Sequence, residues 1–422
     1  MIYLALAALA VGLILWLIVT SRRNQPARNR TQMVSLGSEE LRRLAASLSM
    51  HAAVRKKKRR DGQASSSLHA DMQQVRQAHG AIAGQDQSEE ASPAEQWLLD
   101  NYYYLEQQAH VLAQELRSRR REALPVLADG SIRIAWLAQE LLAHTAGKLD
   151  QPTILEFIEE FQRKTPLMLC ELWALPLYLK LALLSCVAEV SESCQRTRLL
   201  WERADRLAEQ AGAMTTAAWE NCLLEEQALL PDQVEGALVE RLNRRLMEEG
   251  ERSRTALQAL DEAVLRRGFA LSDLIFAEHH RQAREQWMMG NAISSLRFLD
   301  GLQWLKMFRK LSLVERNLLS DPTGVYPTMD AQSQSWYHSR LEKLAAQWDV
   351  SESYLSHCAL ELARQQAHDA RKGHMGYYFL DEGRGELARA VDRKPRRELS
   401  QGSRLALYLT AQWAPALLIS GG

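Results

Sequence analysis

Apolar residues recur at intervals of three and four along most of this chain, and that spacing predicts helices. The pattern is clearest over residues 92–392, where the strict alternation expected of half-buried strands is rare. Six residues in the last quarter of this region fall on one helical stripe: Trp336, Tyr337, Leu341, Leu344, Ala345 and Trp348. The sequence therefore predicts an all-α fold, with a bundle-like domain of roughly a dozen helices over residues 96–392.

Residues that cap or break helices predict several element boundaries. Helix starts are indicated in three places, by Asp150 before Pro152, by Thr165 before Pro166, and by Asp232 three residues before Glu235. Turn-forming residues predict breaks at Asp129-Gly130, over residues 320–324 and at Gly373.

The first residues of the chain predict a membrane anchor. Residues 2–20 carry no charge, and 19 apolar or small residues are long enough to span a bilayer core. Basic residues follow this stretch instead of preceding it, which argues against a cleaved signal peptide. By the positive-inside rule, we expect a single-pass anchor at residues 1–21, with the helical domain in the cytoplasm.

Charge is spread unevenly, although the net charge is zero. Residues 21–60 hold 12 Lys and Arg against 2 acidic residues. Six consecutive cations, Arg55, Lys56, Lys57, Lys58, Arg59 and Arg60, predict binding to the anionic head groups of membrane lipids, each contributing roughly 1 kcal/mol. No aromatic residues interleave with them, so we expect no nucleic-acid partner. The following residues are small and polar, and residues 22–95 as a whole are predicted to be a basic, then low-complexity, flexible and disordered linker.

The end of the chain is apolar again. Residues 405–419 are uncharged and follow a basic stretch, but they are short for a full span and contain Pro415. Residues 393–422 are therefore expected to form a truncated, membrane-like tail. An interfacial helix or a buried terminal helix remains an alternative for this segment.

The common catalytic and metal-binding motifs are absent from the sequence. It contains no Gly-rich phosphate loop, HExxH, GxSxG or Asp-x-Asp, and its five cysteines form no CxxC pair. His279 and His280 are adjacent, but on a helix they point about 100° apart and are poorly placed to share one ion. We therefore predict no catalytic residue, no metal and no cofactor in this chain.

One segment, RKGHMGYYFLDEGRGEL at residues 371–387, combines four glycines with histidine, tyrosine and arginine. Its glycines are typical of a helix end followed by a turn, with the aromatic residues packed in a core. The functional alternative is contact with a sugar or with a partner protein, for which His374, Tyr377, Tyr378 and Arg384 are the candidate residues.

Seven segments together resemble one protein family. They are DNYYYLEQQ (100–108), LPVLADG (124–130), AWLAQELLAHT (135–145), TPLMLCELWALPLYLKLALL (165–184), NAISSLRFLDGLQWLKMFRKLSLVERNL (291–318), GVYPTMD (324–330) and KGHMGYYFLDEGRGEL (372–387). In this order they resemble the amino-terminal region of cyclic β-1,2-glucan synthases, over about residues 97–392.

The resemblance implies a place in glucan synthesis. Members of this family are large membrane proteins that transfer glucose from UDP-glucose, elongate a β-1,2-glucan on the protein, trim it by phosphorolysis and close the ring. The region that resembles this chain precedes their glucosyltransferase and phosphorylase domains, and no catalytic residue carries over. The resemblance thus favours a membrane-anchored, non-catalytic scaffold, either one part of a split synthase or a truncated product, with catalytic glucan synthase domains as partners.

Two alternatives stay open on the sequence alone. The chain could itself transfer or cleave sugars at an unfamiliar site, or it could be a membrane adaptor unrelated to glucan.

Overall fold

The computed structural model describes residues 36–54, 58–84, 91–226, 229 and 234–392. Over these residues the regular elements are sixteen α-helices, α2 to α17, and two short 3₁₀ helices, η2 and η3. The β pairing found there consists of two isolated bridges, Arg59 with Leu124 and Val126 with Ile132. The predicted all-α class is confirmed for this part of the chain. The predicted anchor at 1–21, the tail at 393–422 and the cations at 55–57 lie outside it.

The helices fold into two compact units, where the sequence predicted one helical domain. Unit 1 contains the described residues of Met1–Phe161 and Ala174–Leu302, and unit 2 contains those of Gln162–Trp173 and Gln303–Gly422. Unit 2 is therefore built from two segments of the chain that are far apart in sequence.

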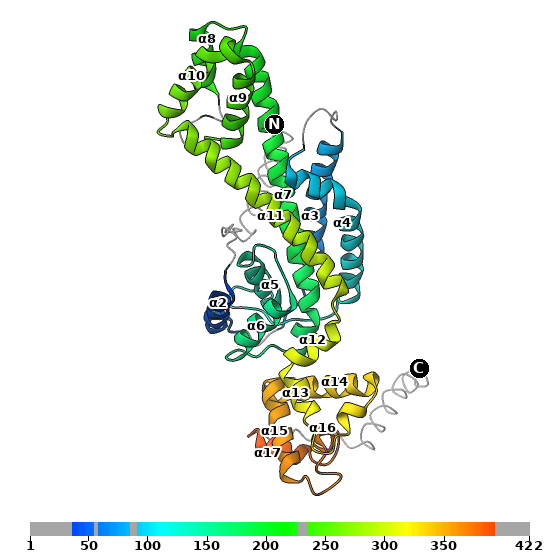
Figure 1. The fold of residues 1–422 in the computed structure, drawn as a ribbon. Helices are drawn as coiled ribbons and strands as arrows, with labels where there is room; N and C mark the ends of the chain where they lie inside the picture. Colours follow the sequence, from blue (N-terminus) through cyan, green and yellow to red (C-terminus); the bar gives the residue numbers. More distant parts are fainter. Residues whose placement is uncertain (1–35, 55–57, 85–90, 227–228, 230–233, 393–422) are drawn as a thin grey trace, which may run out of the picture. The chain divides into compact units, whose positions relative to one another are not determined.

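Unit 1 is organised around long helices that pack along one another (Figure 1). Its elements up to residue 302 are α2 (Ser38–His51), α3 (Ala64–Ala83), α4 (Pro93–Ser118), α5 (Arg133–Ala143), α6 (Gln151–Gln162), α7 (Leu169–Ala211), α8 (Thr216–Glu225), α9 (Gly236–Glu248), η2 (Gly250–Ser253), α10 (Arg254–Leu265) and α11 (Leu271–Gly301). Helix α4 packs against both α3 and α11. The last residue of α6, Gln162, and the first residues of α7, up to Trp173, belong to unit 2.

The prediction of a disordered linker over residues 22–95 is wrong where α2 and α3 form. Helix α3 buries five residues spaced three or four apart: Leu68, Met72, Val75, Ala78 and Ile82. The intervening residues are small and polar, so the average composition resembled a linker. The apolar positions nevertheless recur with the helical period and pack α3 onto α4.

A separate apolar core joins the end of α7 to α8, α9 and α10. Trp219 of α8 is its largest buried side chain, and the indole N–H donates to the Ala256 carbonyl at 3.2 Å. The predicted capping box at Asp232 and Glu235 is only partly matched, because α9 begins at Gly236 with Glu235 as its N-cap residue. Asp232 lies outside the described residues.

Unit 2 is a compact group of short helices. Its elements after residue 302 are α12 (Trp304–Leu311), α13 (Leu313–Leu319), η3 (Tyr326–Thr328), α14 (Ala331–Trp348), α15 (Glu352–Gln365), α16 (Met375–Leu380) and α17 (Arg384–Ala390). The predicted stripe on α14 faces the core, except that Trp336 is 57 % exposed. The predicted break at 320–324 is present, and Gly324 adopts φ +66° there.

Two predicted helix starts had different outcomes. Asp150 Oδ1 accepts a hydrogen bond from the Thr153 amide at 2.8 Å and caps α6, as predicted. The predicted start at Thr165 is wrong, because α7 begins at Leu169. There the Met168 amide donates a hydrogen bond of 2.9 Å to the Glu171 carboxylate. A side chain in the first turn of α7 thus accepts a bond from a backbone N–H that has no partner within the helix.

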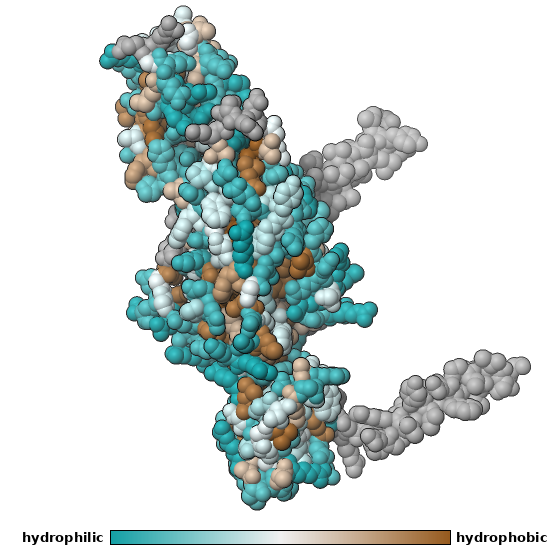
Figure 2. Space-filling model, turned by 45° about the vertical axis from the view of Figure 1, so that its right-hand side comes forward, coloured by the Kyte–Doolittle hydropathy of each residue, from teal (hydrophilic) through white to brown (hydrophobic). Residues whose placement is uncertain are grey.

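Helix α7 is long and apolar enough, by length and composition, to cross a membrane. Its most apolar window is 61 % buried inside the protein, however, and the core helix of a soluble protein meets the same criterion. On the face drawn in Figure 2, apolar residues lie in separate patches among polar ones. The helix is therefore only weak evidence for a membrane span.

Candidate functional site

His374 lies at the centre of a polar cluster in unit 2, immediately before α16. Its Nδ1 is 2.8 Å from Asp321 Oδ2, and its Nε2 is 2.7 Å from the Tyr337 hydroxyl. The Met375 amide donates to Asp321 Oδ1 at 2.8 Å. A neutral imidazole with its proton on Nδ1 satisfies both neighbours, since it donates to the carboxylate and accepts from the tyrosine. The cluster ties the 320–324 turn to α14 and α16.

The electrostatics of this cluster follow from burial and hydrogen bonding. Burial acts to raise the pKa of Asp321, but the hydrogen bonds from His374, Thr323 and the Met375 amide outweigh it and hold that pKa below its ordinary value. Burial, together with the nearby Asp321 charge, raises the pKa of Tyr337 to about 12. Both groups thus keep their usual charge states at neutral pH, the first ionised and the second neutral.

A second cluster of the same kind lies next to the first in unit 2. The Tyr326 hydroxyl donates to Glu315 Oε2 at 2.8 Å, and His338 Nε2 is 2.8 Å from the same oxygen. Burial again opposes the ionised carboxylate, but the bonds from His338 and Tyr326 lower the pKa of Glu315. The rings of Tyr326 and Tyr337 are 5.6 Å apart between centroids and connect the two clusters.

The candidate residues of the 371–387 segment are mostly buried. The Tyr378 side chain is in the core, and its hydroxyl donates to the Leu362 carbonyl at 3.2 Å. Tyr377 is also buried, and the Arg371 guanidinium lies 5.5 Å from the centre of its ring. Arg384 begins α17 at a partly exposed position. These contacts favour the interpretation as a packed turn, and a sugar contact by these residues stays a prediction.

The described part of the basic run joins a second basic segment. Residues 58–60 are exposed, and Arg59 pairs through its backbone with Leu124 by two hydrogen bonds of 2.8 Å. Arg120 and Arg121, just before Leu124 in the sequence, are exposed as well. The fold thus adds cations from the turn after α4 to the predicted membrane-binding run, a combination that the linear sequence did not reveal.

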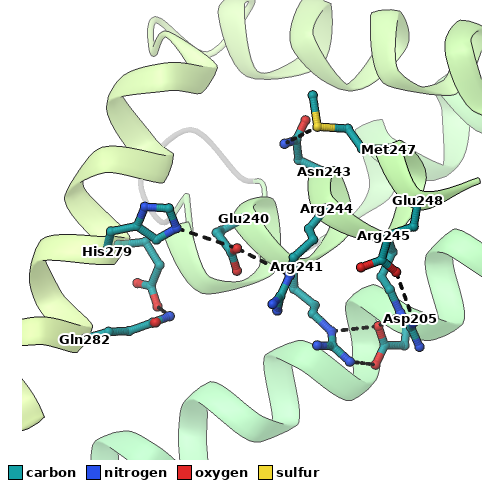
Figure 3. A network of polar contacts seen from close by, with 11 residues as sticks. Asp205, Glu240, Arg241, Asn243, Arg244, Arg245, Met247, Glu248, His279 and Gln282 are labelled. Atoms are coloured by element: carbon teal, nitrogen blue, oxygen red, sulfur yellow. Dashed lines mark hydrogen bonds and ion pairs between the residues drawn. The ribbon is translucent and has the colours of Figure 1, made fainter. Parts of the chain in front are cut away.

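A charged network in unit 1 holds α9 against α7 and α11 (Figure 3). The Arg241 guanidinium donates twice to the Asp205 carboxylate, at 2.9 and 2.8 Å, and Arg245 donates to the same group at 2.8 Å. On the opposite side of α9, Glu240 lies 3.7 Å from His279 Nε2. Each charge has a partner, so this network is a structural clamp. Among the described residues, no group of three or more His, Cys, Asp or Glu side chains is placed to hold a metal ion.

An open pocket, which the sequence did not predict, lies between α4 and α11 in unit 1. It has a volume of about 440 Å³, and its lining includes Gln96, Trp97, Asp100, Asn101, Gln286 and Arg297. Among the lining residues, Asp100 and Asn101 follow Trp97 by three and four positions, which places them on the same helical face. This spacing, in and just before DNYYYLEQQ, was the signal in the sequence that could have indicated the pocket. It identifies only the wall formed by α4, because the other wall comes from α11.

Comparison with known proteins gives one informative match. No protein-family model matches the chain. A cyclic β-(1,2)-glucan synthase, NdvB of Rhizobium meliloti (strain 1021), is 27 % identical to it over 283 residues, which is 65 % of this chain and 10 % of that protein. The chain therefore spans about a tenth of the length of this relative. The match agrees with the resemblance seen in the short segments, and the chain is related to the cyclic β-1,2-glucan synthases.

Proposed function

We propose that this chain is a membrane-anchored, non-catalytic helical module of a cyclic β-1,2-glucan synthase system. It would position glucosyltransferase and phosphorylase domains for glucan synthesis from UDP-glucose at the cytoplasmic face of a bacterial inner membrane. The observation that carries the proposal is the similarity to a glucan synthase over 283 residues, which is 65 % of this chain.

The internal contacts support a scaffold in preference to an enzyme. The two carboxylate–histidine pairs of unit 2 are enclosed by their own tyrosines, and Glu315 and Asp321 are buried. A general acid or base must reach a substrate atom within hydrogen-bond distance. Side chains that bond to one another inside a core are better suited to fixing the fold.

Purification of the native chain from its own membranes in mild detergent tests the proposal. We expect mass spectrometry to find a large glucosyltransferase or phosphorylase polypeptide among the co-purifying proteins, at constant ratio through a sizing column. A mock purification from cells that lack the chain is the control. Recovery of the chain without such a partner would overturn the proposal.

A second assay separates the scaffold from an enzyme. The purified chain, incubated with UDP-glucose and either magnesium or manganese, should release no UDP and form no glucan. Turnover that scales with the amount of chain would show that it carries its own catalytic site.

A further inference from the structure

We propose that the pocket between α4 and α11 binds a segment of neutral glucan, with Trp97 as the surface on which a sugar ring stacks. This inference rests on the proposed function for the identity of the sugar polymer. The pocket itself is defined by the structure of unit 1 alone.

The size and position of the pocket suit such a ligand. Its volume of about 440 Å³ lies in the range of about 300–1,000 Å³ that is usual for small-ligand sites. Four lining residues, Gln96, Asp100, Gln286 and Arg297, are exposed, so the pocket is open to solvent. An open pocket can admit one or two residues of a polymer while the rest of the polymer continues outside it.

Trp97 is fixed by the backbone of the neighbouring helix. A methyl group added at Gly290 of α11 would lie 3.3 Å from the Cε2 and Cζ2 atoms of this indole, so the glycine allows the ring to lie close against α11. The Trp97 side chain remains partly exposed and lines the pocket. A partly exposed indole offers apolar surface on which the C–H groups of a pyranose ring can pack.

Polar side chains around the ring are held in place by one another. Gln96 Nε2 donates to Asp100 Oδ1 at 3.1 Å, and Arg297 Nη2 donates to Asn101 Oδ1 at 2.6 Å. The Arg297 guanidinium also lies 5.2 Å from the centre of the Tyr104 ring. Amide, carboxylate and guanidinium groups together present donors and acceptors side by side, as sugar hydroxyls need, since each hydroxyl both donates and accepts.

The charge of the pocket favours a neutral ligand. Its lining contains one carboxylate, Asp100, and one guanidinium, Arg297, so the formal charges cancel. A nucleotide diphosphate or an anionic head group would be expected to recruit an excess of cations. The balance of charge therefore points to the glucan polymer instead of the UDP-glucose donor.

The test is a titration of the full chain, in detergent, with β-1,2-linked glucose oligosaccharides, monitored by isothermal calorimetry. We expect saturable binding that Trp97→Ala weakens by about tenfold or more and that Trp97→Phe weakens less, because a smaller aromatic face remains. Trp287→Ala is the matched control, since Trp287 is an exposed tryptophan on α11 that does not line the pocket. It should leave binding unchanged.

Two further measurements keep the result interpretable. Gln286→Ala removes an exposed lining side chain without changing the core, and it should also weaken binding. This second variant tests the pocket even if Trp97→Ala fails to fold. UDP-glucose should not compete with the oligosaccharide. Absence of oligosaccharide binding, equal binding by wild type and both pocket variants, or displacement by UDP-glucose would each overturn the inference. If a synthase still co-purifies with the chain in that case, the proposed function stands while the pocket assignment fails.

Discussion

Gly376 occupies a position where even one methyl group meets two hydrogen-bonded side chains. A Cβ atom there would lie 2.2 Å from the Tyr337 hydroxyl and 2.7 Å from His374 Nε2, two atoms that are themselves 2.7 Å apart. Both side chains are held by packing or by Asp321, so they have little room to move. The side chains of Tyr337 and His374 therefore require glycine at position 376, whether or not the backbone turns there.

Replacing Gly376 by alanine should destabilise unit 2 by about 1–3 kcal/mol, the usual effect of overfilling a packed site. Gly385→Ala is the matched control, since a Cβ there meets nothing within 4 Å and the residue lies in helix α17. That change should be neutral or slightly stabilising. Hydrogen exchange of peptides from residues 303–392 would measure both, and equal protection in the two variants would contradict the argument.

Asp321 should make unit 2 sensitive to acid. Its pKa is lower in the folded protein than its ordinary value of 3.8, so the unfolded chain takes up the proton at higher pH than the folded chain does. The stabilisation is complete above that ordinary value and is lost as the pH falls through the lower, folded pKa. Glu315 acts in the same direction, because its pKa is lowered too.

In Asp321→Asn this acid dependence should become shallower, and at neutral pH unit 2 should lose about 1–3 kcal/mol, since a charge-assisted bond to His374 is removed. Urea midpoints followed by hydrogen exchange of residues 303–392, between about pH 3 and pH 7, would measure both effects. A variant with the wild-type slope in the acid limb would show that other carboxylates control the transition.

At the scale of elements, the start of α4 is fixed by a buried ion pair. Glu95 completes a capping box with Ser92 and also accepts two hydrogen bonds from Arg198 of α7, at 2.8 and 3.2 Å. The Arg198 and Glu95 side chains are 6 % and 2 % exposed, so removal of either one leaves the other charge buried. One acidic residue thus both caps α4 and joins it to α7.

Arg198→Ala should therefore destabilise unit 1 by about 3–5 kcal/mol, the range for breaking a buried pair. Arg364→Ala serves as the control, since its pair with Glu361 is exposed on both sides and should contribute less than about 1 kcal/mol. Thermal unfolding, together with hydrogen exchange of the peptides around each pair, would compare them. Similar losses in the two variants would contradict the difference expected from burial.

The sequence predicted elements well where local signals sufficed, and poorly where distant contacts decided. Asp150 caps α6 through its own backbone neighbours, so a local pattern was enough to find it. The start of α7 depends on Glu171 and on the Leu169 amide, which donates to Glu352 at 2.7 Å, and no local pattern at Thr165 contains that partner. The pocket was missed for the same reason, since its walls come from residues 196 positions apart, such as Asn101 and Arg297.

For the molecule as a whole, the predicted contact with a membrane surface can be tested separately from the anchor. The chain lacking residues 1–34 should bind vesicles that contain phosphatidylserine. Neutralisation of Arg55 to Arg60 by glutamine should weaken that binding by about 10⁴-fold at low salt, since each of the six cations contributes roughly 1 kcal/mol. Neutralising six exposed cations elsewhere, Arg266 and Arg284 among them, is the control. Unchanged binding after the Arg55–Arg60 substitutions would refute the head-group role.

Because unit 2 is built from two separate segments of the chain, its folding depends on the order in which those segments are synthesised. Residues 162–173 supply it with the Gln162 bond to the Leu311 carbonyl, at 2.9 Å, and with the stack of Trp173 on Phe308, at 4.1 Å between ring centroids. During synthesis all of residues 174–302 must leave the ribosome before those partners appear, a delay on the order of 10 s. During that interval Trp173 lacks the Phe308 ring on which it stacks in the folded protein. Unit 2 is thus expected to be the last part of the described chain to fold, and the part most dependent on chaperones.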